Sequence, residues 1–187
     1  MRFRSLYFCG LALGVVCAAA QPRRTLDVPY LPTTPDAVAA MLKLAHLSGA
    51  DVLYDLGCGD GRIVIAAAKT YGAHAVGVDL DPDRIMEARD NAKKAGVEKL
   101  VRFEEKDLFQ ADIHEASVVT LFLLSSVNMR LRPKLLEELK PGTRVVSNTF
   151  MMGDWKPDRE VTVGGPPSLG DFSRQLYLWI VPFPRGK

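Results

Sequence analysis

The sequence has few of the residues that a disulfide-stabilised or metal-binding protein needs. Only three of the 187 residues are cysteines, and two of these, Cys9 and Cys17, lie in an N-terminal apolar stretch. The third, Cys58, follows the first glycine of a glycine-rich turn. One remaining thiol supports neither a disulfide framework nor a cysteine metal cluster, so the sequence predicts no metal site.

An excess of charge of one sign is also missing. Lys and Arg number 24 against 22 Asp and Glu, which gives a net charge of +2. Arg2 and Arg4 account for this surplus, and both lie in the N-terminal segment. A balanced domain has no electrostatic attraction for a phosphate backbone, so no nucleic acid partner is expected. The length favours one domain, and the 48% of hydrophobic residues is normal for a globular core.

Residues 1–20 are typical of a targeting segment. Arg2 and Arg4 precede an apolar run of about Leu6 to Val16, and Ala18-Ala19-Ala20 resembles a cleavage site. The run is shorter than the roughly 20 residues of a spanning helix, which favours a signal peptide over an N-terminal membrane segment. Either alternative indicates the cell envelope or membrane association.

The remaining chain divides into a lead-in and one domain. Residues 21–50 are expected to form a linker followed by a helix from Pro35 to about Leu47, with Thr34 as its N-cap. From residue 51 to 187, apolar segments alternate with helical patterns, which favours a parallel sheet. We predict strands at about 51–56, 74–79, 100–104, 117–124, 144–147, 160–163 and 175–181, and helices at 63–69, 82–95 and 133–139.

These elements predict an α/β fold with a doubly wound, mostly parallel seven-stranded sheet, Rossmann-like, closed by a C-terminal antiparallel hairpin. Its first strand runs into Asp55-Leu56-Gly57-Cys58-Gly59-Asp60-Gly61, and the second ends at Asp79. Glycine permits a positive φ and lets a ligand lie directly on the main chain. A carboxylate at the end of the second strand can accept both hydroxyls of a ribose. The turn therefore indicates a nucleoside-binding crevice.

The spacing of the glycines distinguishes between nucleosides. In the dinucleotide fingerprint G-x-G-x-x-G/A the third small residue would fall at position 62, which is Arg62. That large side chain would obstruct close packing of helix on strand, which disfavours a nicotinamide oxidoreductase. Asp55, Gly57, Gly59 and Gly61 instead form acid-x-G-x-G-x-G, and here the sequence resembles the class I S-adenosylmethionine-dependent methyltransferases. The plain alternative is a strand-to-helix turn that happens to be rich in glycine.

The resemblance implies S-adenosyl-L-methionine as cofactor, with its cationic methionine end against the turn around Cys58 and near Asp55. It implies that Asp79 and the adjoining Leu80 contact the nucleoside. It also implies that Asp107 faces the adenine amino group and the Leu108 backbone faces a ring nitrogen. An ordinary capped turn at Asp107 remains the alternative.

Two further segments indicate a narrower family within these methyltransferases. The segment Pro29-Tyr30-Leu31-Pro32-Thr33 and the continuation Val127 to Leu135 are similar to the lysine methyltransferases of the ATP synthase c-subunit and the adenine nucleotide translocase. This implies that Tyr30 and Thr33 lie against the cofactor. A rigid, proline-braced lead-in without ligand contact is the alternative.

The segment after the fourth strand bears on the methyl acceptor. Methyltransferases of DNA bases or glutamine often carry Asn/Asp-Pro-Pro-Tyr/Phe here, whereas this chain has Leu123 to Asn128 without that motif. Ser125, Asn128 and Trp155 are candidates for the acceptor channel, although the polar groups at 125–128 also suit a loop that caps a helix. No catalytic base is evident.

The resemblance therefore implies a protein-lysine N-methyltransferase that acts by direct displacement on a protein substrate, with membrane proteins among the candidates. A small-molecule or lipid methyltransferase and a non-catalytic S-adenosylmethionine-binding module stay open as alternatives. The signal-like N-terminus indicates export, whereas the cofactor, made inside cells, requires access to the cytoplasm.

Overall fold

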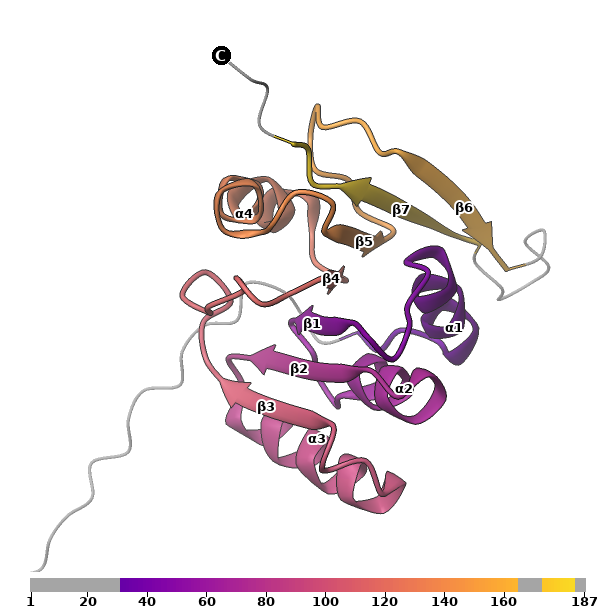
Figure 1. Ribbon diagram of the computed structural model, residues 1–187, viewed down its shortest axis with the longest axis vertical. Coiled ribbons are helices and arrows are strands. Elements are labelled where there is room, and N and C mark those ends of the chain that lie inside the picture. The colour runs from indigo at the N-terminus through magenta and orange to yellow at the C-terminus, as the bar shows by residue number, and fades with distance from the viewer. Residues whose placement is uncertain (1–30, 165–172, 184–187) are drawn as a thin grey trace, which may run out of the picture.

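A computed structural model of the protein describes residues 31–164 and 173–183 (Figure 1). The predictions for residues 1–30, Tyr30 included, lie outside these residues. The strands are β1 (Val52–Leu56), β2 (His74–Asp79), β3 (Val101–Glu105), β4 (Val118–Leu121), β5 (Arg144–Asn148), β6 (Arg159–Val163) and β7 (Arg174–Ile180). The helices are α1 (Pro35–Leu44), α2 (Arg62–Tyr71), α3 (Pro82–Ala95) and α4 (Ser125–Glu138). No helix within the described ranges is long and apolar enough to cross a membrane.

The seven strands form one sheet in the order β3-β2-β1-β4-β5-β7-β6. The pairs from β3 to β5 are parallel, and β7 runs antiparallel to both β5 and β6. This confirms the doubly wound sheet with its antiparallel C-terminal hairpin. The strand order reverses between β1 and β4, and in such sheets ligands bind outside the carboxyl ends of the strands at the reversal.

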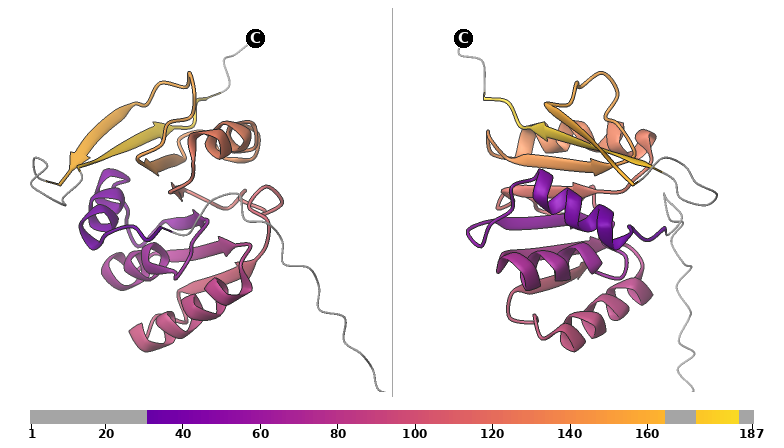
Figure 2. Two further views of the ribbon diagram at one scale, coloured as in Figure 1. Left: turned by 180° about the vertical axis from the view of Figure 1, so that it is seen from behind. Right: turned by 90° about the vertical axis from the view of Figure 1, so that its right-hand side faces the viewer.

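Helices cover both faces of the sheet (Figure 2). Helices α1, α2 and α3 lie on one face, where the core includes Met41, Val64 and Ala88. Helix α4 lies on the other face, over a core that includes Leu131 and Trp179. Because the inner strands are covered on both faces, they consist of nearly continuous apolar residues, as parallel sheets require.

Helix α4 differs from the prediction. It begins at Ser125 and contains Pro133 in its interior, whereas the sequence predicted a loop at 125–128 and a helix starting at Pro133. An interior proline removes one helical hydrogen bond and costs about 3 kcal/mol. Burial of Val127, Leu131 and Leu135, spaced four residues apart along one face, outweighs this cost.

Candidate functional site

A pocket opens at the carboxyl ends of β1, β2 and β3 and is bordered by the lead-in segment 31–33. It encloses about 960 Å³ of space, open solvent at its mouth included. The predicted cofactor residues that line it are Thr33, Asp55, Gly57, Cys58, Gly59, Asp79, Leu80, Asp107 and Leu108. Leu31, Pro32, Asp60, Arg62, Phe122 and Leu123 line it as well.

The glycine turn forms one wall of the pocket and is tied to the second strand. Gly57, Gly59 and Gly61 have φ angles of 85°, 52° and 77°, a region that glycine adopts without a steric penalty. The backbone N–H groups of Gly57 and Cys58 donate to the Val78 carbonyl over 2.8 and 3.0 Å. The turn is therefore held by its main chain, and its backbone faces the pocket.

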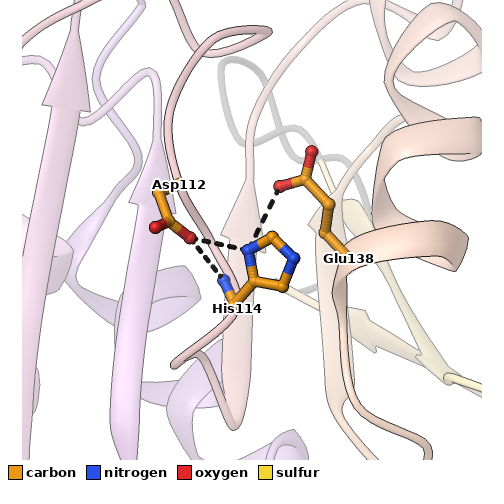
Figure 3. A group of neighbouring side chains, drawn as sticks. All are labelled: Asp112, His114 and Glu138. Carbon is orange, nitrogen blue, oxygen red and sulfur yellow. Dashed lines mark hydrogen bonds and ion pairs between the residues drawn. The ribbon is translucent and has the colours of Figure 1, made fainter.

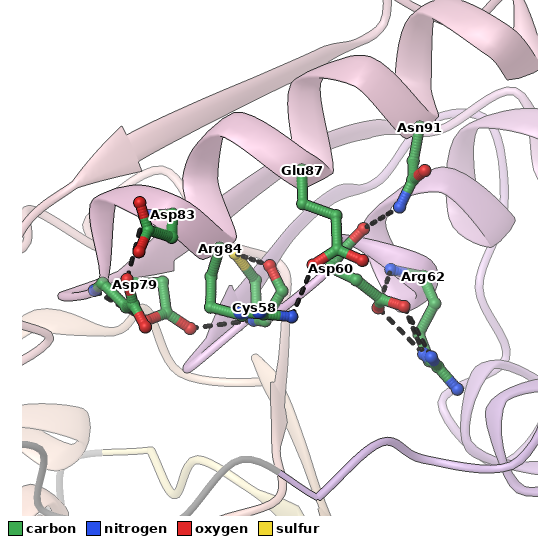
Figure 4. A network of polar contacts seen from close by, with 10 residues as sticks. Cys58, Asp60, Arg62, Asp79, Asp83, Arg84, Glu87 and Asn91 are labelled. Carbon is green, nitrogen blue, oxygen red and sulfur yellow. Dashed lines mark hydrogen bonds and ion pairs between the residues drawn. The ribbon is translucent and has the colours of Figure 1, made fainter.

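Asp79 is oriented by two backbone donors. Its Oδ2 accepts a hydrogen bond from the Gly59 N–H over 2.8 Å, and its Oδ1 accepts one from the Asp81 N–H over 3.0 Å (Figure 4). Each carboxylate oxygen has two lone pairs, so these bonds leave further acceptor capacity at the pocket wall. This arrangement suits a pair of neighbouring hydroxyl groups.

Asp55 lies deeper, at the end of β1, and is 3% exposed. Burial raises the pKa of its carboxyl to about 7, the charges of Asp79 and Asp60 add to this increase, and a hydrogen bond from Thr120 Oγ1 (2.7 Å) opposes it. A cation in the pocket would favour the ionised form of this group. The pocket therefore combines an uncharged backbone cradle with carboxylates, as a cationic nucleoside requires.

The raised pKa of Asp55 predicts a pH effect on stability. The folded protein holds a proton up to about pH 7 that the unfolded chain loses near its ordinary pKa of 3.8. The stability from this group is complete below the unfolded pKa and is lost as the pH rises through about 7. Between pH 5.5 and 7 the wild type should lose about 2 kcal/mol of stability from this group, at about 1.4 kcal/mol per pH unit, and no more up to pH 8.5. Asp55→Asn, which still accepts from Thr120, should lack this loss. Thermal melts of both proteins across this range measure the difference, and parallel curves would contradict it.

Arg62 occupies a different position from the one that the fingerprint comparison assumed. It is the first residue of α2, and its guanidinium pairs with Asp60 (Figure 4). Its Nη1 also donates to the Thr33 carbonyl over 2.7 Å. The side chain therefore ties the lead-in segment to the glycine turn and does not enter the helix–strand contact. The close contact occurs at Gly61, where a Cβ would lie 2.8 Å from Phe103. Gly61 thus shapes the turn without lining the pocket.

The three candidates for the acceptor channel do not line this pocket. Ser125 is exposed at the start of α4, and the buried Asn128 donates from Nδ2 to Ser147 Oγ (3.3 Å) and to the Phe150 carbonyl (3.1 Å). Trp155 packs its ring 6.0 Å from that of Trp179. Asn128 and Trp155 brace α4 and the segment after β5 in this structure.

Phe122 and Leu123 are among the pocket residues that were not sequence candidates. They follow β4 directly, on the other side of β1 from Asp79. Apolar residues at the end of a buried strand look like ordinary core, so only their place at the strand-order reversal could have indicated them.

Cys58 is buried in the turn, 4% exposed. Burial, followed by the nearby charges of Asp55 and Asp79, raises the pKa of its thiol well above the ordinary value. The thiolate is the nucleophilic form of cysteine, so this side chain acts as a small turn residue.

A group of possible metal ligands, Asp112, His114 and Glu138, lies outside the pocket (Figure 3). The ligand atoms lie within 4.8 Å of one another, but each side chain has a protein partner. His114 Nδ1 is 2.7 Å from Asp112 Oδ1, and Glu138 accepts from Lys134 Nζ over 2.6 Å. Asp112 and His114 precede β4, and Glu138 is the last residue of α4. The group therefore lies at the amino ends of the strands, whereas the pocket lies at their carboxyl ends.

Known proteins are similar to this chain in sequence and in fold. Residues 55–159 match the ANTKMT methyltransferase domain family. The chain is 46% identical over 155 residues to a protein-lysine N-methyltransferase of Saccharolobus islandicus, covering 82% of this chain and 94% of that protein. It is 37% identical over 135 residues to the lysine N-methyltransferase of the ATP synthase c-subunit from Xenopus laevis, covering 72% of this chain but only 59% of that protein.

A solved structure gives the cofactor. The crystal structure of an RNA methyltransferase from Salinibacter ruber in complex with S-adenosyl-L-homocysteine has a TM-score of 0.76 and 54% sequence identity, and the match covers 84% of this chain and 97% of that one. S-adenosylhomocysteine is S-adenosylmethionine without the transferable methyl group. The cradle and the carboxylates of the pocket fit S-adenosylmethionine, whose methionine end carries a sulfonium cation. The chain therefore belongs to the ANTKMT methyltransferase family, and it is an S-adenosylmethionine-dependent methyltransferase.

Proposed function

We propose that this methyltransferase modifies the side-chain amine of lysine in a protein substrate. The 46% identity to the archaeal protein-lysine N-methyltransferase, over 82% of this chain, carries the proposal. The sequence after β4 also lacks the proline-containing motif of the DNA-base and glutamine methyltransferases, and Leu124 leads directly into α4.

The pocket residues divide into three roles under this proposal. Thr33, Asp55, Gly57, Cys58 and Gly59 would surround the methionine end of the cofactor, because they form the turn and the lead-in at one end of the pocket. Asp79 and Leu80 would hold the ribose. Asp107 and the Leu108 backbone, at the end of β3, would face the adenine.

The reaction needs little proton chemistry from the protein. Bound S-adenosylmethionine supplies a methyl group on a sulfonium, and the lone pair of lysine Nζ forms the new C–N bond as the C–S bond breaks. Lysine has an ordinary pKa of about 10.4, so its ammonium must first release a proton to solvent. An apolar wall such as Phe122 and Leu123 disfavours the ammonium and lowers that pKa. The protein therefore contributes mainly alignment and exclusion of water.

A labelling experiment tests the substrate class. Purified protein is incubated with a cell lysate, separated into membrane and soluble fractions, and S-adenosylmethionine that carries a trideuterated methyl group. We expect mass spectrometry to find the label on lysine Nζ, with the membrane fraction as the richer source because the related enzymes are named for the ATP synthase c-subunit and the adenine nucleotide translocase.

RNA is the rival substrate, because the Salinibacter protein is named an RNA methyltransferase. The balance of charges disfavours it, since this chain carries 24 basic and 22 acidic residues. Treating the labelled lysate with ribonuclease or with protease distinguishes an RNA substrate from a protein substrate. Label that survives protease and is released by ribonuclease would refute the lysine assignment, and label only in small molecules or lipids would do so as well.

A further inference from the structure

A cluster of side chains lies next to the cofactor pocket on the side away from Asp79. It consists of Phe122 after β4, Asn148 at the end of β5 and Arg174 at the start of β7. Strand register places Asn148 opposite Leu176, two residues from Arg174. Since alternate residues of a strand share a face, Asn148 and Arg174 lie on one face of the sheet as diagonal neighbours.

The aromatic rings connect this cluster to the pocket. The Arg174 guanidinium lies 5.7 Å from the centroid of the Phe122 ring, and Phe122 lines the pocket. Phe122 also stacks on Phe150, with 6.0 Å between the ring centroids and 29° between the ring planes. A cation over an aromatic face is an attractive contact, so it fixes the guanidinium beside the pocket.

Two hydrogen-bond donors in the cluster have no acceptor among the described residues. Asn148 is fully buried, and its Oδ1 accepts from Thr149 Oγ1 (2.9 Å), but its Nδ2 has no partner. Arg174 Nη1 is buried and also has none, and Arg174 forms no salt bridge within the described ranges. A buried donor without an acceptor destabilises the folded protein, and more so when it is charged. A ligand that carries an oxygen atom would remove this cost.

We propose that Arg174 and Asn148 form a subsite for an oxygen atom of the methyl-accepting substrate, a carboxylate or a carbonyl close to the lysine. The inference rests on the proposed lysine activity. Both unpaired groups are donors, so they cannot accept from a lysine ammonium, and the lone pair of a neutral amine must point at the methyl group. The guanidinium charge favours a carboxylate over a neutral carbonyl. Phe122 would meanwhile contact the aliphatic stem of the lysine, because it borders both the pocket and the cluster.

A peptide series tests the subsite. Seven-residue polyalanine peptides with a central lysine carry Glu, Gln or Ala at one of the three positions on either side, and kcat/KM is measured with full-length protein. A charge-assisted hydrogen bond is worth about 1.5–3 kcal/mol, so at the favoured position we expect Glu to exceed Ala by about 10- to 100-fold. An equal preference for Gln would identify a carbonyl as the partner, which also supports the subsite.

Variants separate recognition from folding. Arg174→Gln is expected to reduce the preference for Glu to within about twofold, and Arg174→Lys, which keeps the charge, to restore part of it. Arg159→Gln on β6, outside the cluster, is the matched control and keeps the wild-type preference. Calorimetric affinity for S-adenosylhomocysteine should be the same in all of them, because none of these side chains lines the pocket.

Three results would count against the subsite. An unchanged preference in Arg174→Gln overturns it, as does a wild-type enzyme that labels lysines in lysate proteins but in no peptide of the series. Absence of methyl-lysine from both lysate and peptides instead refutes the proposed function, and the subsite with it.

Discussion

Replacing Asp79 with alanine is expected to weaken binding of S-adenosylhomocysteine by at least about 100-fold. The wild-type carboxylate is held in place by the N–H groups of Gly59 and Asp81, so it is already oriented toward the pocket. Hydrogen bonds to a charged group are worth about 1.5–3 kcal/mol each, and the variant would lose two from the ribose hydroxyls. Isothermal titration calorimetry measures the loss.

Asp90→Ala is the matched control for this prediction. Asp90 is an exposed acid on α3 that does not line the pocket, so its removal changes net charge equally and should leave the affinity unchanged. Circular dichroism shows whether each variant is folded. A folded Asp79→Ala protein that binds with wild-type affinity would refute the assignment of the ribose to Asp79.

The second large effect is on stability and concerns Gly61. An alanine there would have to adopt φ of 77°, and its Cβ would lie 2.8 Å from Phe103 and 2.9 Å from Ala88. The left-handed conformation costs about 1–2 kcal/mol, and overpacking of a core adds about 1–3 kcal/mol. We therefore expect Gly61→Ala to lower the melting temperature by roughly 5–15 °C in a differential scanning calorimeter.

Gly96→Ala separates the two causes. Gly96 has a φ of 70°, but a Cβ there would have no atom within 4 Å, so only the backbone cost applies. Its melting temperature should fall by clearly less than that of Gly61→Ala. Replacing the neighbouring Phe103 with the smaller leucine, in the double variant Gly61→Ala/Phe103→Leu, should recover part of the lost melting temperature. Equal decreases in the two single variants would show that packing at Gly61 contributes nothing.

The parallel sheet and its glycine turn could be predicted from the sequence because their signals are local. A buried parallel strand reads as a continuous apolar run, and Ala75 to Val78 within β2 show this clearly. The turn requires positive φ at alternate positions, which glycine marks directly, and the structure has positive φ at Gly57, Gly59 and Gly61. The residues of this pocket wall could thus be identified before the fold was known.

Features that depend on contacts between distant elements could not be predicted in this way. A proline normally marks a helix start, and only the burial of Val127 and Leu131 against the sheet explains why α4 continues through Pro133. Asn128 was a candidate for the channel of the methyl acceptor because it follows β4. Its side chain instead donates hydrogen bonds to Ser147 Oγ and the Phe150 carbonyl. The cluster of Phe122, Asn148 and Arg174 is formed by three strands, and their register is not encoded locally.

We propose that the pocket at the ends of β1, β2 and β3 holds S-adenosylmethionine in one defined orientation. A crystal structure of the protein with S-adenosylhomocysteine tests it most directly. We predict ribose hydroxyls within hydrogen-bond distance of Asp79, the adenine amino group at Asp107, and the sulfur on the side of Phe122. A nucleoside bound elsewhere, or one whose ribose leaves Asp79 with only Gly59 and Asp81 as partners, would contradict it.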